Sequence, residues 1–258
     1  MQVQRIQNNN YSNSSYYKGN GRPVFKANTR GIDLPSHKYW DLFIGTKIPS
    51  SLELNPIIFK YLKPDDNICD IGMGYGKTIL ELIKNGYRNL SGIDTNKSGV
   101  DFAKRTINEL NLNGKFKFIN ANAENTGLPD KSQDAIITQA FWTTITNSLD
   151  RKNILNEIDR ILKKFGILYI SDFGQTPEIL KYKHRYDLGI KKGYEKGTFE
   201  VINETSGKLE YLAHHYTKDE FTKLLEEKGF KIEEYIIAPV QTRSGNTING
   251  HTIIARKV

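Results

Sequence analysis

Short apolar runs alternate with amphipathic stretches over most of this 258-residue sequence. This alternation predicts an α/β protein of three layers (α/β/α), in which helices cover both faces of a mostly parallel sheet. The runs at 68–71 and 134–138 are typical of strands that are buried on both faces. The last two runs, 231–238 and 250–256, have no helical segment between them, so we expect a C-terminal antiparallel hairpin. The length suits one domain, with or without an insertion.

The first 66 residues precede this alternation and divide into two segments. Residues 1–22 are rich in Asn, Ser, Tyr and Gly and show no periodicity, so we interpret them as a mobile N-terminal arm. Residues 23–66 contain short apolar pieces separated by prolines, which predict helical pieces near 38–44 and 55–62. We interpret this second segment as an N-terminal helical lid.

The strands and helices of the predicted sheet then follow in a regular order. The predicted strands are 67–71, 89–93, 115–119, 134–139 and 166–172, and the predicted helices between them are 76–85, 96–112 and 150–163. Asn-Gly pairs at 85–86 and 113–114 are expected to end the first two helices. In the second helix the apolar residues recur every three or four positions, which puts them on one face.

Residues 174–216 interrupt this rhythm and are rich in tyrosine and histidine. Within them, the runs 198–202 and 208–212 alternate like the two strands of a hairpin. A capping box at 217–220, with the sequence Thr-Lys-Asp-Glu, then begins another helix. We therefore interpret residues 67–258 as one domain that carries an insertion at 174–216.

Composition excludes several classes of protein. No apolar stretch approaches 18 residues, and the first residues lack the apolar core of a signal peptide. The single cysteine, Cys69, cannot form an intramolecular disulfide, so we expect a reducing, cytoplasmic location and no membrane partner. The net charge is +8, and residues 1–64 hold nine basic and three acidic residues. Because these bases are scattered, we favour an ordinary lysine-rich surface over a nucleic-acid-binding arm.

A glycine-rich turn follows the first buried run. It reads Asp70-Ile71-Gly72-Met73-Gly74-Tyr75-Gly76, and Asp94 closes the next predicted strand, 22 positions beyond Gly72. Glycines permit backbone dihedral angles and a close ligand approach that a Cβ atom would block. A carboxylate at the tip of the second strand can accept hydrogen bonds from both hydroxyls of a ribose. The arrangement therefore predicts a nucleoside-binding half-site.

Two phosphate-binding interpretations fit this turn less well. A dinucleotide site of the Gly-x-Gly-x-x-Gly type would need a third glycine where Lys77 stands, and Asp70 would repel a pyrophosphate. A P-loop would match Gly76-Lys77-Thr78, but Gly72 comes one residue too late for its first glycine. A nucleotide hydrolase that uses Lys77 is therefore an alternative that we do not favour.

The turn at 70–76 resembles motif I of the class I S-adenosylmethionine (SAM)-dependent methyltransferases. Leu128-Pro129 resembles the turn that leads into the fourth strand of that family, and 162–170 resembles its Leu-Lys-Pro-Gly-Gly stretch, with Lys-Phe in place of Pro-Gly. The resemblance covers about residues 64–173 at matching spacings. It implies a Rossmann-like methyltransferase sheet, SAM as the methyl donor and S-adenosylhomocysteine as the product.

The resemblance also implies which residues bind the cofactor. The glycine turn would carry the methionine part of SAM, whose ammonium group tolerates a carboxylate such as Asp70. Asn122 stands where the family often has Asp, and its side-chain oxygen can still accept from the adenine amino group. The expected cofactor-binding residues are Asp70, Gly72, Gly74, Tyr75, Gly76, Asp94, Thr95, Asn122, Ala123, Glu124 and Gln139.

We expect the methyl acceptor to bind outside the carboxyl ends of the strands, beneath the lid and the insertion at 174–216, which the family commonly uses to cover its substrate. The candidate contacts are Tyr39, Trp40, Phe141, Trp142, His184 and Tyr211. For the first four, packing in the core or at the edge of the sheet is an equal alternative.

His214 and His215 are the candidates for a general base. In an extended strand neighbouring side chains point to opposite faces, so one of the two could face the acceptor. A structural role is the favoured alternative for each of them. We expect no metal site, because the sequence contains no cluster with the spacing of metal ligands.

Absent motifs narrow the acceptor. The loop after the fourth predicted strand lacks the Asn-Pro-Pro-Tyr type of motif that amino-group nucleic-acid methyltransferases carry, and no acidic cluster resembles the magnesium site of catechol-type enzymes. These absences favour transfer to a nitrogen or oxygen atom of a small molecule or peptide. An RNA methyltransferase and an inactive SAM-binding protein are the alternatives, and the oligomeric state is undetermined.

Overall fold

The computed structural model describes residues 16–17, 23–24, 52–203 and 205–258. Strands β1 (Tyr16–Tyr17) and β2 (Pro23–Val24) pair in a small antiparallel sheet. The predicted helix near 38–44, with Tyr39 and Trp40, lies outside the described residues, as does most of the predicted arm. Among the helices of the described ranges, none combines the length and apolar character needed to cross a lipid bilayer.

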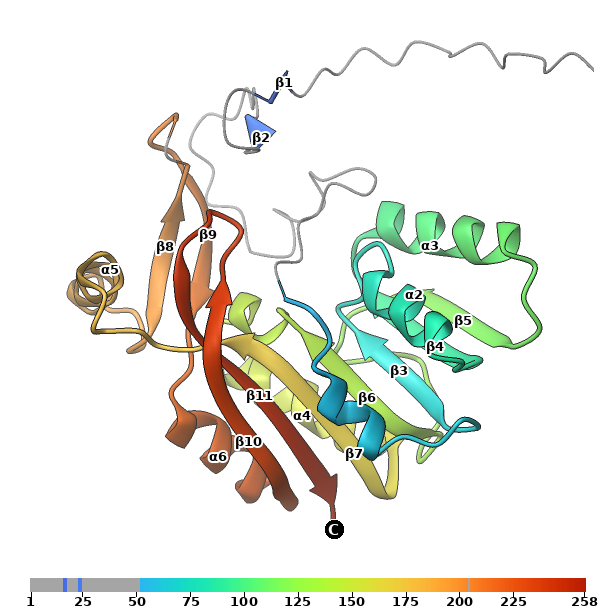
Figure 1. Cartoon of the computed structure of the whole chain (residues 1–258). Helices are drawn as coiled ribbons and strands as arrows, with labels where there is room; N and C mark the ends of the chain where they lie inside the picture. Colours follow the sequence, from blue (N-terminus) through green and yellow to red (C-terminus); the bar gives the residue numbers. More distant parts are fainter. Residues whose placement is uncertain (1–15, 18–22, 25–51, 204) are drawn as a thin grey trace, which may run out of the picture.

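A seven-stranded sheet forms the centre of the molecule, in the order β10-β11-β7-β6-β3-β4-β5 (Figure 1). Its strands are β3 (Asn67–Ile71), β4 (Asn89–Asp94), β5 (Lys115–Asn120), β6 (Gln133–Gln139), β7 (Leu162–Phe173), β10 (Phe230–Gln241) and β11 (Thr247–Lys257). The five neighbouring strands β7, β6, β3, β4 and β5 pair in parallel, whereas β11 is antiparallel to both of its neighbours. The predicted sheet and its C-terminal antiparallel hairpin are confirmed.

Helices cover both faces of this sheet because its buried strands alternate apolar side chains between the two faces. Ile68 packs into a core cluster with α2 (Lys77–Lys84), α3 (Lys97–Glu109) and the short helix η1 (Pro56–Lys60). The next residue, Cys69, packs on the opposite face. There it joins a cluster formed with α4 (Ser148–Ile161) and α6 (Lys218–Glu227). The three predicted layers are therefore present.

Some element boundaries differ from the sequence-based expectations for local reasons. Helix α3 ends at Glu109, before the expected Asn-Gly pair, and Asn111 two residues later takes a left-handed φ of 46°. Strand β7 begins at Leu162, directly after α4, and Phe165 within it takes a left-handed φ of 64°. The predicted helical piece near 55–62 is the 3-10 helix η1, which Asn55 caps.

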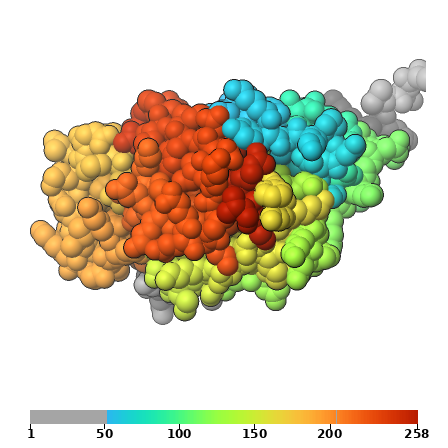
Figure 2. Space-filling model, turned by 90° about the horizontal axis from the view of Figure 1, so that it is seen from below, coloured from blue at the N-terminus to red at the C-terminus, as the bar shows by residue number. Residues whose placement is uncertain are grey.

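The insertion forms its own small unit at one end of the molecule. It contains α5 (Leu180–Lys191) and the antiparallel hairpin of β8 (Thr198–Ile202) and β9 (Leu209–His214). The space-filling view shows it as a lobe beyond β10 (Figure 2). Tyr182 and Tyr186 of α5 pack against Phe199 of β8 in a separate core cluster. The hairpin was predicted from the sequence, whereas α5 was not.

The turn that follows β5 is anchored to α4 by one buried carboxylate. Glu157 accepts hydrogen bonds from the backbone nitrogen of Thr126 at 2.8 Å and from its hydroxyl at 2.6 Å. Its other oxygen pairs with Arg160 at 2.7 Å, and Arg160 also donates to the Leu128 carbonyl at 2.8 Å. Burial raises the pKa of Glu157, but the bonds from Arg160 and Thr126 outweigh this and lower the pKa to about 2.

We predict that Glu157→Gln lowers the free energy of unfolding at pH 7 by about 1–3 kcal/mol, because an ionised acceptor is lost from a buried network. The native pKa lies below the ordinary value, so this contribution is present above about pH 4.5 and is lost as the pH falls toward 2. Urea unfolding at pH 7 and pH 3 measures it, and the difference from wild type should shrink at pH 3. Glu227→Gln, an exposed change on α6, is the control. A difference independent of pH would contradict the assignment.

Candidate functional site

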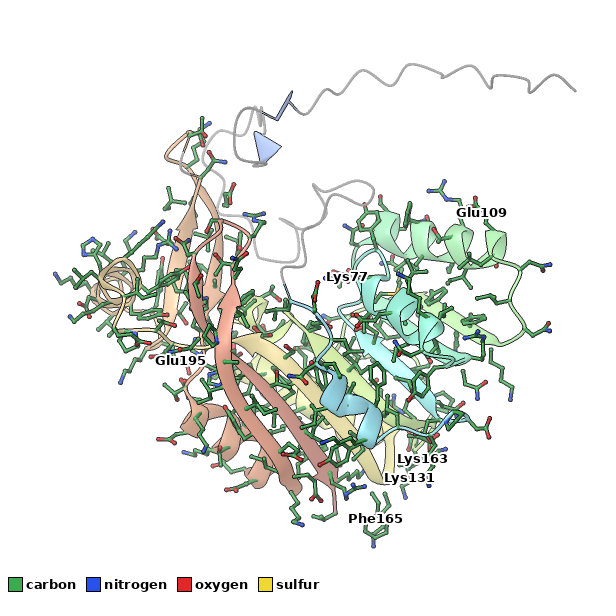
Figure 3. The ribbon with its side chains drawn as sticks, viewed as in Figure 1. Lys77, Glu109, Lys131, Lys163, Phe165 and Glu195 are labelled. Carbon is green, nitrogen blue, oxygen red and sulfur yellow. The ribbon has the colours of Figure 1, made fainter. Side chains whose placement is uncertain are left out.

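The carboxyl ends of β3, β4 and β6 meet where the strand order reverses. Strand β3 lies between β4 on one side and β6 on the other, so the chain leaves it in one direction and returns in the other. Ligands of open α/β sheets bind outside the strand ends at such a switch point. Lys77, labelled in Figure 3 at the start of α2, marks this edge of the sheet.

The glycine turn after β3 has the backbone that its sequence predicts. Gly72, Gly74 and Gly76 have φ angles of 80°, 52° and 83°, in the left-handed region that favours glycine. At Gly72 space is restricted as well, since a Cβ atom there would lie 2.6 Å from a ring carbon of Phe141. The backbone nitrogen of Gly72 donates to the Ile93 carbonyl at 2.8 Å, which ties the turn to the end of β4.

Asp94 at the tip of β4 holds the same turn with its side chain. One carboxylate oxygen accepts from the backbone nitrogen of Gly74 at 2.7 Å, and the other accepts from that of Asn96 at 2.8 Å. A carboxylate has about four acceptor sites, so these bonds do not prevent contacts with the hydroxyls of a bound ribose. Asp94 therefore shapes the turn, and its role in binding a nucleoside stays a prediction.

Asp70, the first residue of the motif, is buried with one orphaned atom. Its side chain is hydrogen-bonded with Thr78 of α2, whereas Oδ2 has no hydrogen-bond partner among the described residues. Burial, and secondarily the charge of Asp94, raise the pKa of Asp70 to about 8. A buried carboxylate without a partner is unfavourable unless a cation or donor satisfies it. This carboxylate oxygen thus fits a ligand that carries an ammonium group.

The tip of β5 supplies the third side of this region. Thr95 and Asn122 are exposed and Ala123 is buried. The side-chain oxygen of Asn122 accepts from the backbone nitrogen of Glu124 at 3.1 Å, which shapes the turn. Asn120, which the sequence analysis missed, donates from its amide nitrogen to the Thr95 carbonyl at 2.7 Å. The sequence signal that could have identified Asn120 is its position as a polar residue directly after the predicted strand 115–119.

The end of β6 is strained and bears the two aromatic candidates. Ala140 has a φ of 50°, a conformation that is uncommon outside glycine and often occurs at functional sites. Gln139 is buried, and its side-chain oxygen accepts from Thr78 at 3.3 Å. Phe141 is half-buried, and its ring lies close against Gly72. Trp142 is fully buried in the cluster with α4, so the structure places it in the core.

Asp172, which the sequence analysis also missed, positions this loop from the end of β7. It is completely buried, and its carboxylate accepts from the backbone nitrogens of Thr143 at 3.2 Å and Phe173 at 2.8 Å. Burial raises the pKa of Asp172 to about 7, although the backbone donors oppose this. Its carboxylate thus holds the short helix η2 (Trp142–Thr144) in place.

The histidine pair of the insertion is buried rather than open. His214 accepts or donates at Nδ1 with the Thr198 hydroxyl at 2.7 Å, and His215 at Nδ1 with the Tyr186 hydroxyl at 2.9 Å. Burial, followed by the charge of His214, lowers the pKa of His215 to about 3, so His215 is neutral at pH 7. The catalytic role of either residue stays a prediction.

The remaining candidates lie in three places. His184 is exposed on α5, and Tyr211 is half-buried in β9. Tyr75 stands in the glycine turn and contacts the ring of Phe102 on α3, with centroids 5.4 Å apart. Lys77, the residue on which a P-loop would depend, donates from Nζ to the Leu52 carbonyl at 2.9 Å. It is therefore engaged with the segment that precedes η1.

Comparisons with known proteins agree on one family. Residues 62–229 match a family model described as a methyltransferase domain. A ubiquinone/menaquinone biosynthesis C-methyltransferase (UbiE) of Campylobacter jejuni is 29% identical over 190 residues, which cover 68% of this chain and 74% of the relative.

Solved structures agree with this. One described as SAM-dependent methyltransferases from Methanosarcina mazei is 37% identical, has a TM-score of 0.76, and matches over 80% of this chain and 99% of that one. A magnesium protoporphyrin IX methyltransferase (ChlM) from Synechocystis PCC 6803 with bound SAH shares 16% identity and a TM-score of 0.55 over 78% of each chain, a likeness of fold alone.

We predict that Gly72→Ala destabilises the protein more than Gly86→Ala, which changes another glycine with positive φ. A Cβ atom at Gly86 meets nothing within 4 Å, so that variant should lose only about 1–2 kcal/mol for its backbone conformation. At Gly72 the Phe141 ring must also move, which adds about 1–3 kcal/mol of overpacking. Urea unfolding of both variants measures the difference, and equal losses would show that the ring does not restrict this turn.

Proposed function

Because this chain belongs to the class I SAM-dependent methyltransferases, we propose that it transfers the SAM methyl group to a small-molecule acceptor. The single observation that supports the proposal is the buried Oδ2 of Asp70, which has no partner among the described residues and lies in the turn whose Gly74 nitrogen donates to Asp94. A phosphate ligand would be repelled there, whereas an amino acid attached to a nucleoside matches both groups.

In this proposal each side of the site binds one part of the cofactor. Asp70 pairs with the ammonium group, and the glycine turn from Gly72 to Gly76 accommodates the methionine chain. Asp94 accepts from the ribose hydroxyls, with Thr95 beside it, and residues 122–124 lie along the adenine. Bound SAM supplies a methyl group that is activated by its sulfonium.

The chain's own task in the transfer is alignment. A methyl displacement needs the attacking atom and the methyl carbon in line at about 3–3.5 Å, and little else. The loop from Gln139 to Phe141 adjoins the glycine turn, and Asp172 fixes its geometry from behind. We propose that this loop walls the acceptor site. We assign no general base, since His214 and His215 are both buried and each engages Nδ1 with a hydroxyl of the insertion.

The attacked atom is a further part of the proposal. The motifs absent from the sequence favour a nitrogen or oxygen atom as the methyl acceptor. The name of the Campylobacter jejuni relative, a C-methyltransferase, adds an electron-rich carbon as a third possibility. The acceptors worth testing first are therefore phenol-, quinone- and amine-type small molecules, with RNA as the alternative substrate.

The decisive experiment combines cofactor binding with product detection. Calorimetry should show SAM and S-adenosylhomocysteine binding to the full chain, and mass spectrometry should find an acceptor that gains about 14 daltons, the mass of one methylene. We predict that Asp94→Ala weakens SAM binding by about 1–3 kcal/mol, roughly 5- to 150-fold, since a charged acceptor is lost. Asp219→Ala, an exposed change on α6, should bind normally. Absence of SAM binding by the wild type would overturn the function, and binding without turnover of any acceptor would indicate an inactive SAM-binding protein.

A second prediction concerns pH. Burial keeps Asp70 largely protonated near neutrality, so pairing with the SAM ammonium group requires loss of its proton. SAM affinity should therefore rise between pH 6 and pH 7.5, below the pKa of about 8, and binding should release protons. Calorimetry in buffers of different ionisation enthalpy measures that release. Asp70→Asn should bind more weakly and without this pH dependence; a wild-type pH profile in the variant would contradict the pairing.

A further inference from the structure

Three side chains from separate segments converge where the insertion meets α6. They are Glu195 in the turn between α5 and β8, His214 at the end of β9, and Glu220 in the first turn of α6. Figure 3 labels Glu195 at this junction of the insertion with the rest of the fold. One nitrogen or oxygen atom from each of the three lies within 4.8 Å of the other two.

His214 points an unpartnered nitrogen into this group. Its side chain is 1% exposed, and Nδ1 lies 2.7 Å from the Thr198 hydroxyl. Nε2 has no hydrogen-bond partner within the part of the chain that the structure describes, and the Glu220 carboxylate lies 3.6 Å away. Buried polar atoms without partners are rare in native structures. Histidines that bind metals through one ring nitrogen donate a hydrogen bond from the other, as Nδ1–H of His214 can to the Thr198 hydroxyl oxygen.

Both carboxylates have a second partner outside this group. Glu220 uses Oε2 in the capping box with the backbone nitrogen and hydroxyl of Thr217, while Oε1 faces His214. Glu195 uses Oε2 in an ion pair with Arg151, which also donates to the carbonyls of Ile145 and Thr146. Two carboxylates against one guanidinium leave one negative charge next to the imidazole.

We propose that Glu195, His214 and Glu220 form a binding site for a divalent transition-metal ion of the Zn²⁺ type. One imidazole nitrogen and two carboxylate oxygens are ligands that this class of ion prefers. Bonds of about 2.1 Å require donor atoms within about 4.2 Å of each other, so only a small side-chain movement is needed. Glu195, whose side chain is 42% exposed, can supply the movement and leaves room for water to complete the coordination.

An ion here would tie the insertion to the core and to the loop that follows β6. Tyr216, two residues after His214, stacks on Phe221 of α6 at 4.3 Å and donates to the Trp142 carbonyl at 3.0 Å. Arg151 holds the other end of that loop. The ion therefore fixes the position of the insertion relative to η2, which follows the loop proposed to wall the acceptor site. The site itself does not depend on the proposed reaction.

The test uses the full chain, stripped of metal with a chelator and then titrated with ZnCl₂. Calorimetry should show one high-affinity site per chain, and Zn²⁺ should raise the thermal unfolding temperature. Co²⁺ in place of Zn²⁺ should give the visible absorption of a protein-bound ion. These readouts are independent of methyl transfer, so their failure is distinct from failure of the enzyme assignment.

Matched variants locate the site. Glu220→Gln keeps the capping box, in which Gln also serves, and Glu195→Gln changes an exposed residue, so neither should prevent folding. Each should weaken Zn²⁺ binding at least tenfold, as should His214→Gln. His184→Gln on α5 and Glu227→Gln on α6 are exposed controls that should bind like wild type. No stoichiometric binding by the wild type, or unchanged binding in all three variants, would overturn the proposal and leave a plain His214–Glu220 ion pair.

Discussion

The hydrogen bonds from the glycine turn to Ile93 and Asp94 organise the proposed cofactor site. They pull the turn after β3 onto the tip of β4, so that two parallel strands end in one continuous surface. Asp70, at the end of β3, is buried, and no donor among the described residues reaches its Oδ2. In the proposed function, Asp94 accepts from the nucleoside and Asp70 receives the ammonium group.

The loop proposed to wall the acceptor site is organised by a carboxylate of a different kind. Asp172 accepts several backbone donors, and so acts as a scaffold for the loop after β6 rather than as a group open to ligands. The insertion meets this loop through Tyr216 and Arg151, whose hydrogen bonds end on carbonyls between Trp142 and Thr146. Changes in the insertion can therefore reach the wall of the proposed acceptor site through a short chain of contacts. The proposed cation site sits at the base of this connection.

Sequence reasoning succeeded where the determining interactions are local. Three glycines in one turn, Asn85-Gly86 and the Thr217–Glu220 capping box each act within a few residues, and the structure has them as expected. Helix α5 escaped because its tyrosines face inward while Leu180, Leu188 and Ile190 are exposed, so no clean apolar face marks it. Asp172 and Asn120 escaped because their partners lie on other elements. The convergence of Glu195, His214 and Glu220 was likewise invisible in their spacing.

The amino-acid sequence by itself determined the order of strands and helices, the glycine turn, and the acidic residue at the end of β4, because these depend on periodicity, turn chemistry and strand ends. Those same features carried the family and its cofactor. Only the tertiary structure decided which side chains are buried and which meet. It placed Trp142 in the core, enclosed His214 and His215, and left Oδ2 of Asp70 without a partner among the described residues. Burial and orphaned polar atoms arise from packing between distant elements, which no local pattern records.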